Sequence, residues 1–339
     1  TTEIYTLSLH DALPISCGNP QPVFGKTGHR EIPPSQARAN SQPTQNPALK
    51  LSTNLKSRIE SRWKVTRLLP TTIAAMLLGT TGFADPIHTA AINGDNDFFR
   101  NLEPKLRKGL DHVRRAENGL VYNPPANPQC AYGFTDIAAK TGHLLFTSLL
   151  YYQACVELDN LQKGMGGDHA VNYRARADLI HKNLSILWDD QAGMYLAADE
   201  GCRQIDIWGS AYAAEVGLAT DEQQDRIADY LLAHWDEIVQ RGQVRHLPGK
   251  EGWQRLFVDW HPVGSYINGA HWATPLPWVV PVVARKAPER AVQMVSDVID
   301  DFQANGVAEC INGDTRNVPN FVASITNLYA ASRWLAEQD

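Results

Sequence analysis

The segment Asp221–Val283 shows the alternation that decides the fold. It begins with DEQQDRIADYLLAHWDEIVQR over Asp221–Arg241, where acids stand at the start and Arg241 at the end, as the helix dipole favours. A polar and aromatic loop over 242–270 follows. The segment ends with AHWATPLPWVVPVV over Ala270–Val283, which is apolar and carries no Asp, Glu, Lys or Arg. A charged outer helix, a loop and an apolar inner helix together make up one helical hairpin.

The same order recurs over 85–339, and the sequence therefore predicts an all-α domain of eight helices. In the outer helices, apolar residues recur at the three-to-four spacing of half-buried helices. The expected helices cover Asp97–Arg115, Asp136–Leu161, Ala170–Trp188, Ile207–Leu218, Asp221–Arg241, Ala270–Arg285, Pro288–Ala304 and Val322–Ala336. Thr135 is the expected N-cap of the second helix. Short strand pieces are expected only at Met194–Ala197 and Leu256–Val258.

Four loops contain most of the residues that could carry chemistry, and each loop precedes an inner helix. They run roughly over 119–135, 189–206, 242–270 and 305–321. Repeated hairpins that stack around a ring place their equivalent loops on one face. We therefore expect the four loops to meet at one rim, and the functional site to lie there.

Three N-terminal segments lie outside this expected domain. Residues 1–15, TTEIYTLSLHDALPI, resemble the in-frame translation of a sequencing adapter. Residues 16–63 are rich in Pro, Gln, Asn and Ser, which is typical of disorder or of translated non-coding DNA. Residues 64–84 have the basic start, apolar run and small residues of a secretory signal, or they are a helix remnant. A true signal would imply a periplasmic or secreted protein; otherwise a cytoplasmic location is favoured.

Composition narrows the classes of partner. The formal net charge is −6 and no block of Lys or Arg is present, so we expect no nucleic acid partner. The apolar run in 64–84 is shorter than the ~20 residues of a membrane-spanning helix, so no integral membrane segment is expected. The five Cys form neither a disulfide framework nor a CxxC pattern, and no HExxH is present. We therefore predict no metal and no cofactor, and the sequence leaves the oligomeric state open.

Five phrases, in this order along the chain, resemble the six-hairpin glycosidases, whose domain is an (α/α)6 toroid. They are CAYGFTDIAAKTGHLLFTSLLYYQA, CRQIDIWGSAYA, GQVRHLPG with WQRL, YINGAHWATPLPWV and GVAECINGDTRNVPNFVASITN. The resemblance is to a bacterial, glycogen-debranching-like (amylo-α-1,6-glucosidase-like) branch and covers about 97–336. Because that family has twelve helices in six hairpins, the eight expected helices imply an N-terminally incomplete ring of about four hairpins.

The resemblance implies hydrolysis of a glycosidic bond in an oligosaccharide or glycoconjugate, with inversion. In many inverting members the loops before the sixth and twelfth helices supply a general acid and a general base, which correspond here to Asp136 and Glu309. One carboxyl must be protonated and the other ionised, and we expect Asn312 and Arg316 to keep Glu309 charged. Asp206 is an alternative acid, a sugar ligand or a helix cap. Inversion implies that the two carboxyls lie roughly 6.5–9.5 Å apart.

The rim loops also supply the candidates for substrate binding. Loop tryptophans such as Trp253 and Trp260 could stack on a pyranose ring, whereas those on outer helices are expected to serve packing. One or two of the loop arginines could bind the carboxylate of a uronic acid, or they form salt bridges with neighbouring acids. The full set of binding candidates is Arg203, Trp208, Arg245, His246, Trp253, Arg255, Asn268, His271, Trp272, Asn312 and Asp314.

Other hypotheses stay open on the sequence alone. The same ring is used by uronide hydrolases and sugar epimerases, which place their acid and base differently. A non-catalytic carbohydrate-binding toroid, or an inactive fragment, would show the same loops without a competent carboxyl pair. The fold by itself does not decide among them.

Overall fold

The computed structural model describes residues 96–128, 133–166 and 171–338. All described residues belong to one compact unit. The three N-terminal segments at 1–15, 16–63 and 64–84 lie outside the described residues. Within the described ranges, no helix combines the length and the apolarity that crossing a bilayer requires.

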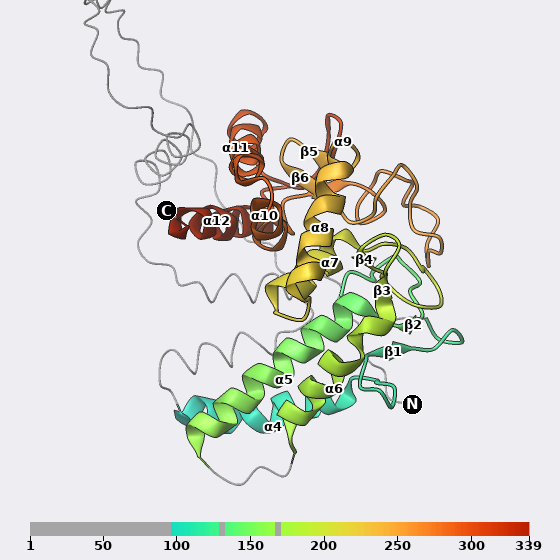
Figure 1. The fold of residues 1–339 in the computed structure, drawn as a ribbon, viewed down its shortest axis with the longest axis vertical. Coiled ribbons are helices and arrows are strands. Elements are labelled where there is room, and N and C mark those ends of the chain that lie inside the picture. Colours follow the sequence, from blue (N-terminus) through green and yellow to red (C-terminus); the bar gives the residue numbers. More distant parts are fainter. Residues whose placement is uncertain (1–95, 129–132, 167–170, 339) are drawn as a thin grey trace, which may run out of the picture. The chain divides into compact units, whose positions relative to one another are not determined.

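The eight predicted helices are present and form four hairpins within the described part of the chain (Figure 1). The outer helices are α4 (Asn96–His112), α6 (Tyr173–Asn183), α8 (Asp221–Ala233) and α11 (Pro288–Asn305). The inner helices are α5 (Leu145–Met165), α7 (Ile207–Glu215), α10 (Leu276–Ala284) and α12 (Val322–Glu337). Inner helix α5 packs on α7, α7 on α10 and α10 on α12, while each inner helix also contacts an outer one. This is the predicted alternation of outer and inner layers.

Local sequence explains where several helices begin and end. Thr220 and Gln223 form a capping box at the start of α8, each side chain bonding the other's backbone. Helix α11 begins at Pro288, where the missing N–H costs nothing, and stops at Gly306, which has φ +80°. Helix α10 is buried on nearly all sides, which accounts for its uniformly apolar sequence.

Two inner helices begin later than predicted. Helix α5 starts at Leu145 rather than Asp136, so Thr135 is not its N-cap. The intervening backbone pairs with distant loops instead: Ala139 N donates to Arg255 O at 2.9 Å. Helix α10 starts at Leu276 rather than Ala270, because the preceding residues form a strand. The 136–144 segment is therefore not helical, and it contains a short strand at Gly142–His143.

The chain contains more strand than was predicted. Two small hairpins pair β1 (Tyr122–Asn123) with β2 (Gly142–His143) and β3 (Trp188–Asp189) with β4 (Met194–Tyr195). A five-stranded antiparallel sheet joins, in order, β5 (Val239–Gln240), β6 (Gln243–Arg245), β7 (His271–Trp272), β8 (Ala308–Asn312) and β9 (Thr315–Pro319). The 3-10 helix η1 (Leu184–Leu187) and the short helix α9 (Trp235–Ile238) precede β3 and β5.

The predicted strand at Met194–Ala197 is present in its first half, as β4. The predicted strand at Leu256–Val258 is wrong, since only Leu256 forms an isolated bridge, to Ala138. The large sheet was not foreseen. It joins the loops that precede α10 and α12, and so positions both loops at one rim.

Candidate active site

Asp136, Tyr266 and Glu309 come together from three loops that are far apart in sequence. Asp136 is exposed in the loop before α5, and the Tyr266 hydroxyl donates a hydrogen bond of 2.9 Å to its Oδ2. Glu309 is the second residue of β8, before α12. The charge of Asp136 contributes to raising the pKa values of both Tyr266 and Glu309, so the two carboxyls lie within electrostatic range of each other. This pair joins the two positions predicted to be catalytic.

The environment of Glu309 differs from the one predicted. Burial, followed by the charge of Asp136, raises the pKa of Glu309 to about 7. The expectation that Arg316 would help to keep Glu309 charged is wrong, because Arg316 is bound elsewhere. It donates to the carboxylate of Asp301 and, at 3.2 Å, to the carbonyl oxygen of Gly306. Glu309 therefore changes its protonation near neutral pH.

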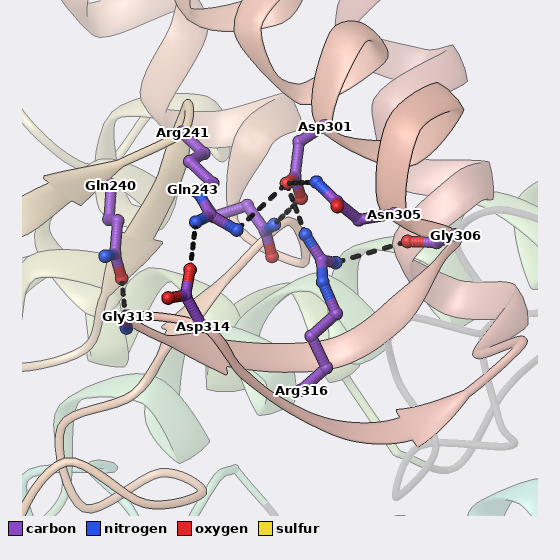
Figure 2. A network of polar contacts seen from close by, with 9 residues as sticks. All are labelled: Gln240, Arg241, Gln243, Asp301, Asn305, Gly306, Gly313, Asp314 and Arg316. Carbon is purple, nitrogen blue, oxygen red and sulfur yellow. Dashed lines mark hydrogen bonds and ion pairs between the residues drawn. The ribbon is translucent and has the colours of Figure 1, made fainter.

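A buried carboxylate holds the hairpin that carries Glu309 (Figure 2). Asp301 on α11 has a side chain that is 1% exposed. It accepts hydrogen bonds from Gln243 Nε2 at 3.1 Å and from Asn305 Nδ2 at 3.0 Å, and Arg316 Nη2 donates to it from β9. Because these partners belong to β6, α11 and β9, the network ties the β8–β9 hairpin to the body of the domain.

Arg241, in the turn between β5 and β6, extends this network to the tip of the hairpin. It donates to Asp301 at 3.4 Å and to Asp314 at 2.7 Å (Figure 2). The Gly313 N–H donates to Gln240 Oε1 at 3.1 Å. The predicted substrate ligand Asp314 thus lies in an exposed ion pair, which fastens the hairpin turn to β5 and the residue after it.

The backbone beside Asp136 is strained at two aromatic residues. Phe134 and Tyr266 have φ of +57° and +46°, the left-handed region that bulky residues avoid. Such conformations persist only where surrounding contacts impose them, and they concentrate at functional sites. In this case the strained Tyr266 directs its hydroxyl at Asp136, and burial raises the pKa of that hydroxyl, so it remains a donor.

A line of aromatic rings leads from solvent to this site. Trp260 is 68% exposed, and its ring centroid lies 3.9 Å from that of His261. His261 stacks on Tyr266 at 5.2 Å, and Tyr266 lies 5.3 Å from Trp272. Burial lowers the pKa of His261, which favours the neutral imidazole. These rings offer flat apolar faces next to Asp136.

Beneath the site lies a buried pair, Asp206 and His246. Both side chains are fully buried, and His246 Nε2 lies 3.0 Å from Asp206 Oδ1. Asp206 is also the N-cap of α7, accepting from the Gly209 N–H at 2.6 Å. His246 stacks on Trp208 at 4.4 Å. The structure thus places the alternative acid Asp206 as a helix cap without surface contact to solvent.

The remaining predicted residues fall into three groups. The first group is buried and packs within or against the rim loops: Trp208, His246, Trp253, Asn268 and Trp272. The second group lies side by side on β6 and β7 and consists of Arg245 and His271. The third group is exposed and consists of Arg203, Arg255, Asn312 and Asp314. Asn268 illustrates the first group. Its Oδ1 accepts from the Trp253 N–H at 2.8 Å and its Nδ2 donates to His261 O at 2.9 Å, which fixes the loop.

Sequence reasoning missed the roles of Tyr266, His261 and Lys140. Tyr266 and His261 lie in the 242–270 loop. The available signal for a role in the site was an aromatic ring in a segment that lacks the hydrophobic periodicity of a helix. Lys140 is 2% exposed, with Nζ 4.2 Å from the centroid of the Trp253 ring. Its place in the apolar run after Asp136 gave no sign of this contact. The described residues contain no group of three or more His, Cys, Asp or Glu that could hold a metal ion.

No protein-family model and no curated protein matches this sequence. Solved structures do match. An uncharacterized conserved protein from Thermus thermophilus has a TM-score of 0.51 at 14% identity, over 78% of this chain and 76% of that chain. A GH63 mannosylglycerate hydrolase from the same organism has a TM-score of 0.48 at 15% identity, over 71% and 73% of the two chains.

A GH78 family rhamnosidase of Bacillus sp. GL1 has a TM-score of 0.46 at 16% identity, over 75% of this chain and 25% of that chain. The match at a TM-score of 0.51 concerns the fold alone. Together with the four hairpins of the described residues, it confirms the predicted all-α toroid fold.

Proposed function

We propose that this protein hydrolyses a glycosidic bond by carboxylic acid/base catalysis, with Asp136 as the general acid and Glu309 as the general base. The supporting observation is the electrostatic coupling of these two carboxyls, which lie in loops preceding two inner helices. Glycoside hydrolysis requires two such groups on opposite sides of the scissile bond. The aromatic line from Trp260 to Trp272 would supply the wall on which a sugar ring packs.

The raised pKa of Glu309 suits a general base. A base works best when its pKa lies near the working pH, because it is then ionised and still binds the abstracted proton well. With a pKa of about 7, Glu309 would be a stronger base than an ordinary glutamate. In the reactive state Asp136 would hold a proton and Glu309 would be ionised. Asp136 would give its proton to the departing oxygen while Glu309 takes one from the attacking water, and the sugar would leave with inverted configuration.

Turnover by single variants tests the proposal. A panel of aryl glycosides should reveal hydrolysis by the full-length chain, and Glu309→Gln should lower kcat by at least about a thousandfold, since the water would lose its activation. Asp136→Asn should lower kcat equally for substrates with poor leaving groups. It should lower kcat much less for nitrophenyl glycosides, whose leaving group needs little protonation. Glu222→Gln, an exposed position on α8, is the matched control. Wild-type turnover that survives both site variants would reject the proposal.

A further inference from the structure

The guanidinium of Arg245 is buried without a carboxylate partner. Arg245 is 6% exposed, and no carboxylate of the described residues lies within ion-pair distance of it. Its Nη1 donates to Gly249 O, but Nε has no hydrogen-bond partner in the described part of the chain. Burial lowers the pKa of Arg245, and the counteracting charge of Glu237 acts from beyond ion-pair distance. A buried charge without a counter-ion destabilises the folded state, so its presence calls for a ligand.

The sheet brings Arg245 close to the proposed base. Arg245 on β6 pairs with His271 on β7, and His271 pairs with Ile311 on β8. Because paired residues on neighbouring antiparallel strands lie about 5 Å apart, the backbone of Arg245 is roughly 10 Å from that of Ile311. Ile311 follows Glu309 by two residues on the same strand. Arg245 therefore lies within reach of a substrate whose scissile bond is at Glu309.

The neighbouring loop is built around this guanidinium. Gly269 has φ +108°, and a Cβ at that position would lie 2.6 Å from Arg245 Nη2. Gly269 lies three residues after Tyr266, whose hydroxyl donates a hydrogen bond to Asp136. The loop that borders Arg245 therefore also borders the site. His271 does not share the positive charge. Burial and the charge of Arg245 lower the pKa of His271 to about 4, which leaves its imidazole neutral at pH 7.

The other arginines in or beside the sheet are already paired. Arg316 donates to Asp301, and Arg241 donates to Asp301 and Asp314. Arg245 differs from both in lacking an acidic partner among the described residues. An arginine guanidinium is planar and can bind a carboxylate through two parallel N–H donors. In Arg245 this group is therefore available to a carboxylate from outside the protein.

We propose that Arg245 binds a carboxylate carried by the substrate, so that the site selects anionic glycosides. The carboxylate would belong either to the sugar, as in a uronic acid, or to the leaving group. This inference rests on the proposed function only for the position of the bond to be cleaved. It adds the chemical class of substrate that the acid/base pair alone does not define.

Thermal unfolding of the full chain with small ligands tests the inference without turnover. D-glucuronate, but not D-glucose, should raise the unfolding temperature of the wild type by several degrees. Arg245→Met should lose at least ten times in glucuronate affinity and should itself unfold at a higher temperature than the wild type, since an unpaired buried charge has been removed. Arg245→Lys should retain part of the affinity. Arg333→Met, at an exposed arginine on α12, should behave as the wild type.

The arms of the experiment separate the outcomes. Stabilisation by glucuronate but not by lactate places the carboxylate on the sugar, and stabilisation by both allows it on the leaving group; either result supports the inference. Equal stabilisation by glucose, or a glucuronate effect that survives Arg245→Met, overturns it. A carboxylate effect without turnover of any glycoside would contradict the proposed function and leave this inference standing. Turnover of neutral glycosides with no stabilisation by glucuronate would contradict this inference and leave the proposed function standing.

Discussion

The Tyr266 hydroxyl and the Asp136 carboxylate form a 2.9 Å hydrogen bond between residues that are 130 positions apart in sequence. Tyr266 adopts a left-handed backbone conformation to make this contact, and its ring is packed between His261 and Trp272. The bond therefore fixes the position of the proposed acid relative to the loop before α10. It also keeps a hydroxyl donor on one of the two carboxyls that would do the chemistry.

Tyr266→Phe should lower kcat/KM by roughly tenfold, which corresponds to about 1.4 kcal/mol, the size of a single hydrogen bond to a charged group. The expected loss lies in kcat, because the ring that packs against the substrate is retained. Steady-state kinetics on one aryl glycoside measure it. Tyr329→Phe, at a partly exposed tyrosine on α12, is the control. An unchanged kcat would show that Asp136 does not depend on this bond.

The pH dependence of kcat/KM should follow the ionisation of Glu309. Because one carboxyl must be protonated while the other is ionised, and the pKa of Glu309 is about 7, kcat/KM should fall about tenfold per pH unit above pH 7, where the pair no longer holds a proton. Since the charge of Asp136 helps to raise this pKa, a carbon-13 NMR titration of Glu309 in Asp136→Asn should show a lower value. An unaltered titration would contradict the coupling of the pair.

Glu157 provides a test of stability away from the site. Burial raises the pKa of this α5 glutamate to about 7, and Gln153 is its hydrogen-bond partner. The folded state therefore binds this proton more tightly than the unfolded state, and its contribution to stability is present below about pH 4.5 and is lost as the pH rises through 7. A shift of this size corresponds to at most about 3 kcal/mol.

Glu157→Gln should therefore gain stability relative to the wild type as the pH rises from 4.5 to 8. Urea unfolding at both pH values measures this difference, and comparison with the wild type cancels the opposing effects of buried histidines such as His271. Glu222→Gln, at an exposed site, should show no such trend. A constant difference across this pH range would mean that Glu157 titrates normally.

Much of the helical architecture could be predicted because its information is local. The pattern of apolar and charged residues within a helix indicates how much of that helix is buried. It indicates a half-buried helix at Asp221–Ala233 and a fully buried one at Leu276–Ala284. The start of α5 could not be found in this way. Residues 136–144 are apolar enough for a helix, but their backbone groups bond to Arg255 and other distant partners, which no local pattern reveals.

The hairpin of β8 and β9 has a local signal in the sequence. Its two-residue turn, Gly313–Asp314, is of a kind that favours tight hairpins, but the short flanking strands were not predicted. The residues Asp136 and Glu309 were singled out through family resemblance, and the Tyr266 contact depends on tertiary structure alone. The raised pKa of Glu309 likewise depends on burial, so its polar sequence neighbours were a poor guide.

Asp301→Asn should test how firmly the hairpin holds Glu309. Removing one charge from a buried ion pair typically costs about 3–5 kcal/mol. Here Arg316 would lose its acidic partner, and Arg241 would lose one of its two. We expect a similar loss in the free energy of unfolding, together with a fall in kcat and a shifted pH profile. Asp314→Asn breaks only an exposed pair and should cost less than about 1 kcal/mol. Equal losses in the two variants would show that Asp301 has no special role in holding the hairpin.

The configuration of the first-formed product tests the central claim most directly. Proton NMR, recorded within the first minutes of hydrolysis of a substrate found in the aryl glycoside panel, distinguishes the two anomers before they equilibrate. An acid/base pair that activates water on the opposite face predicts a product with the inverted anomeric configuration. A product that retains the configuration of the substrate would contradict the roles assigned to Asp136 and Glu309.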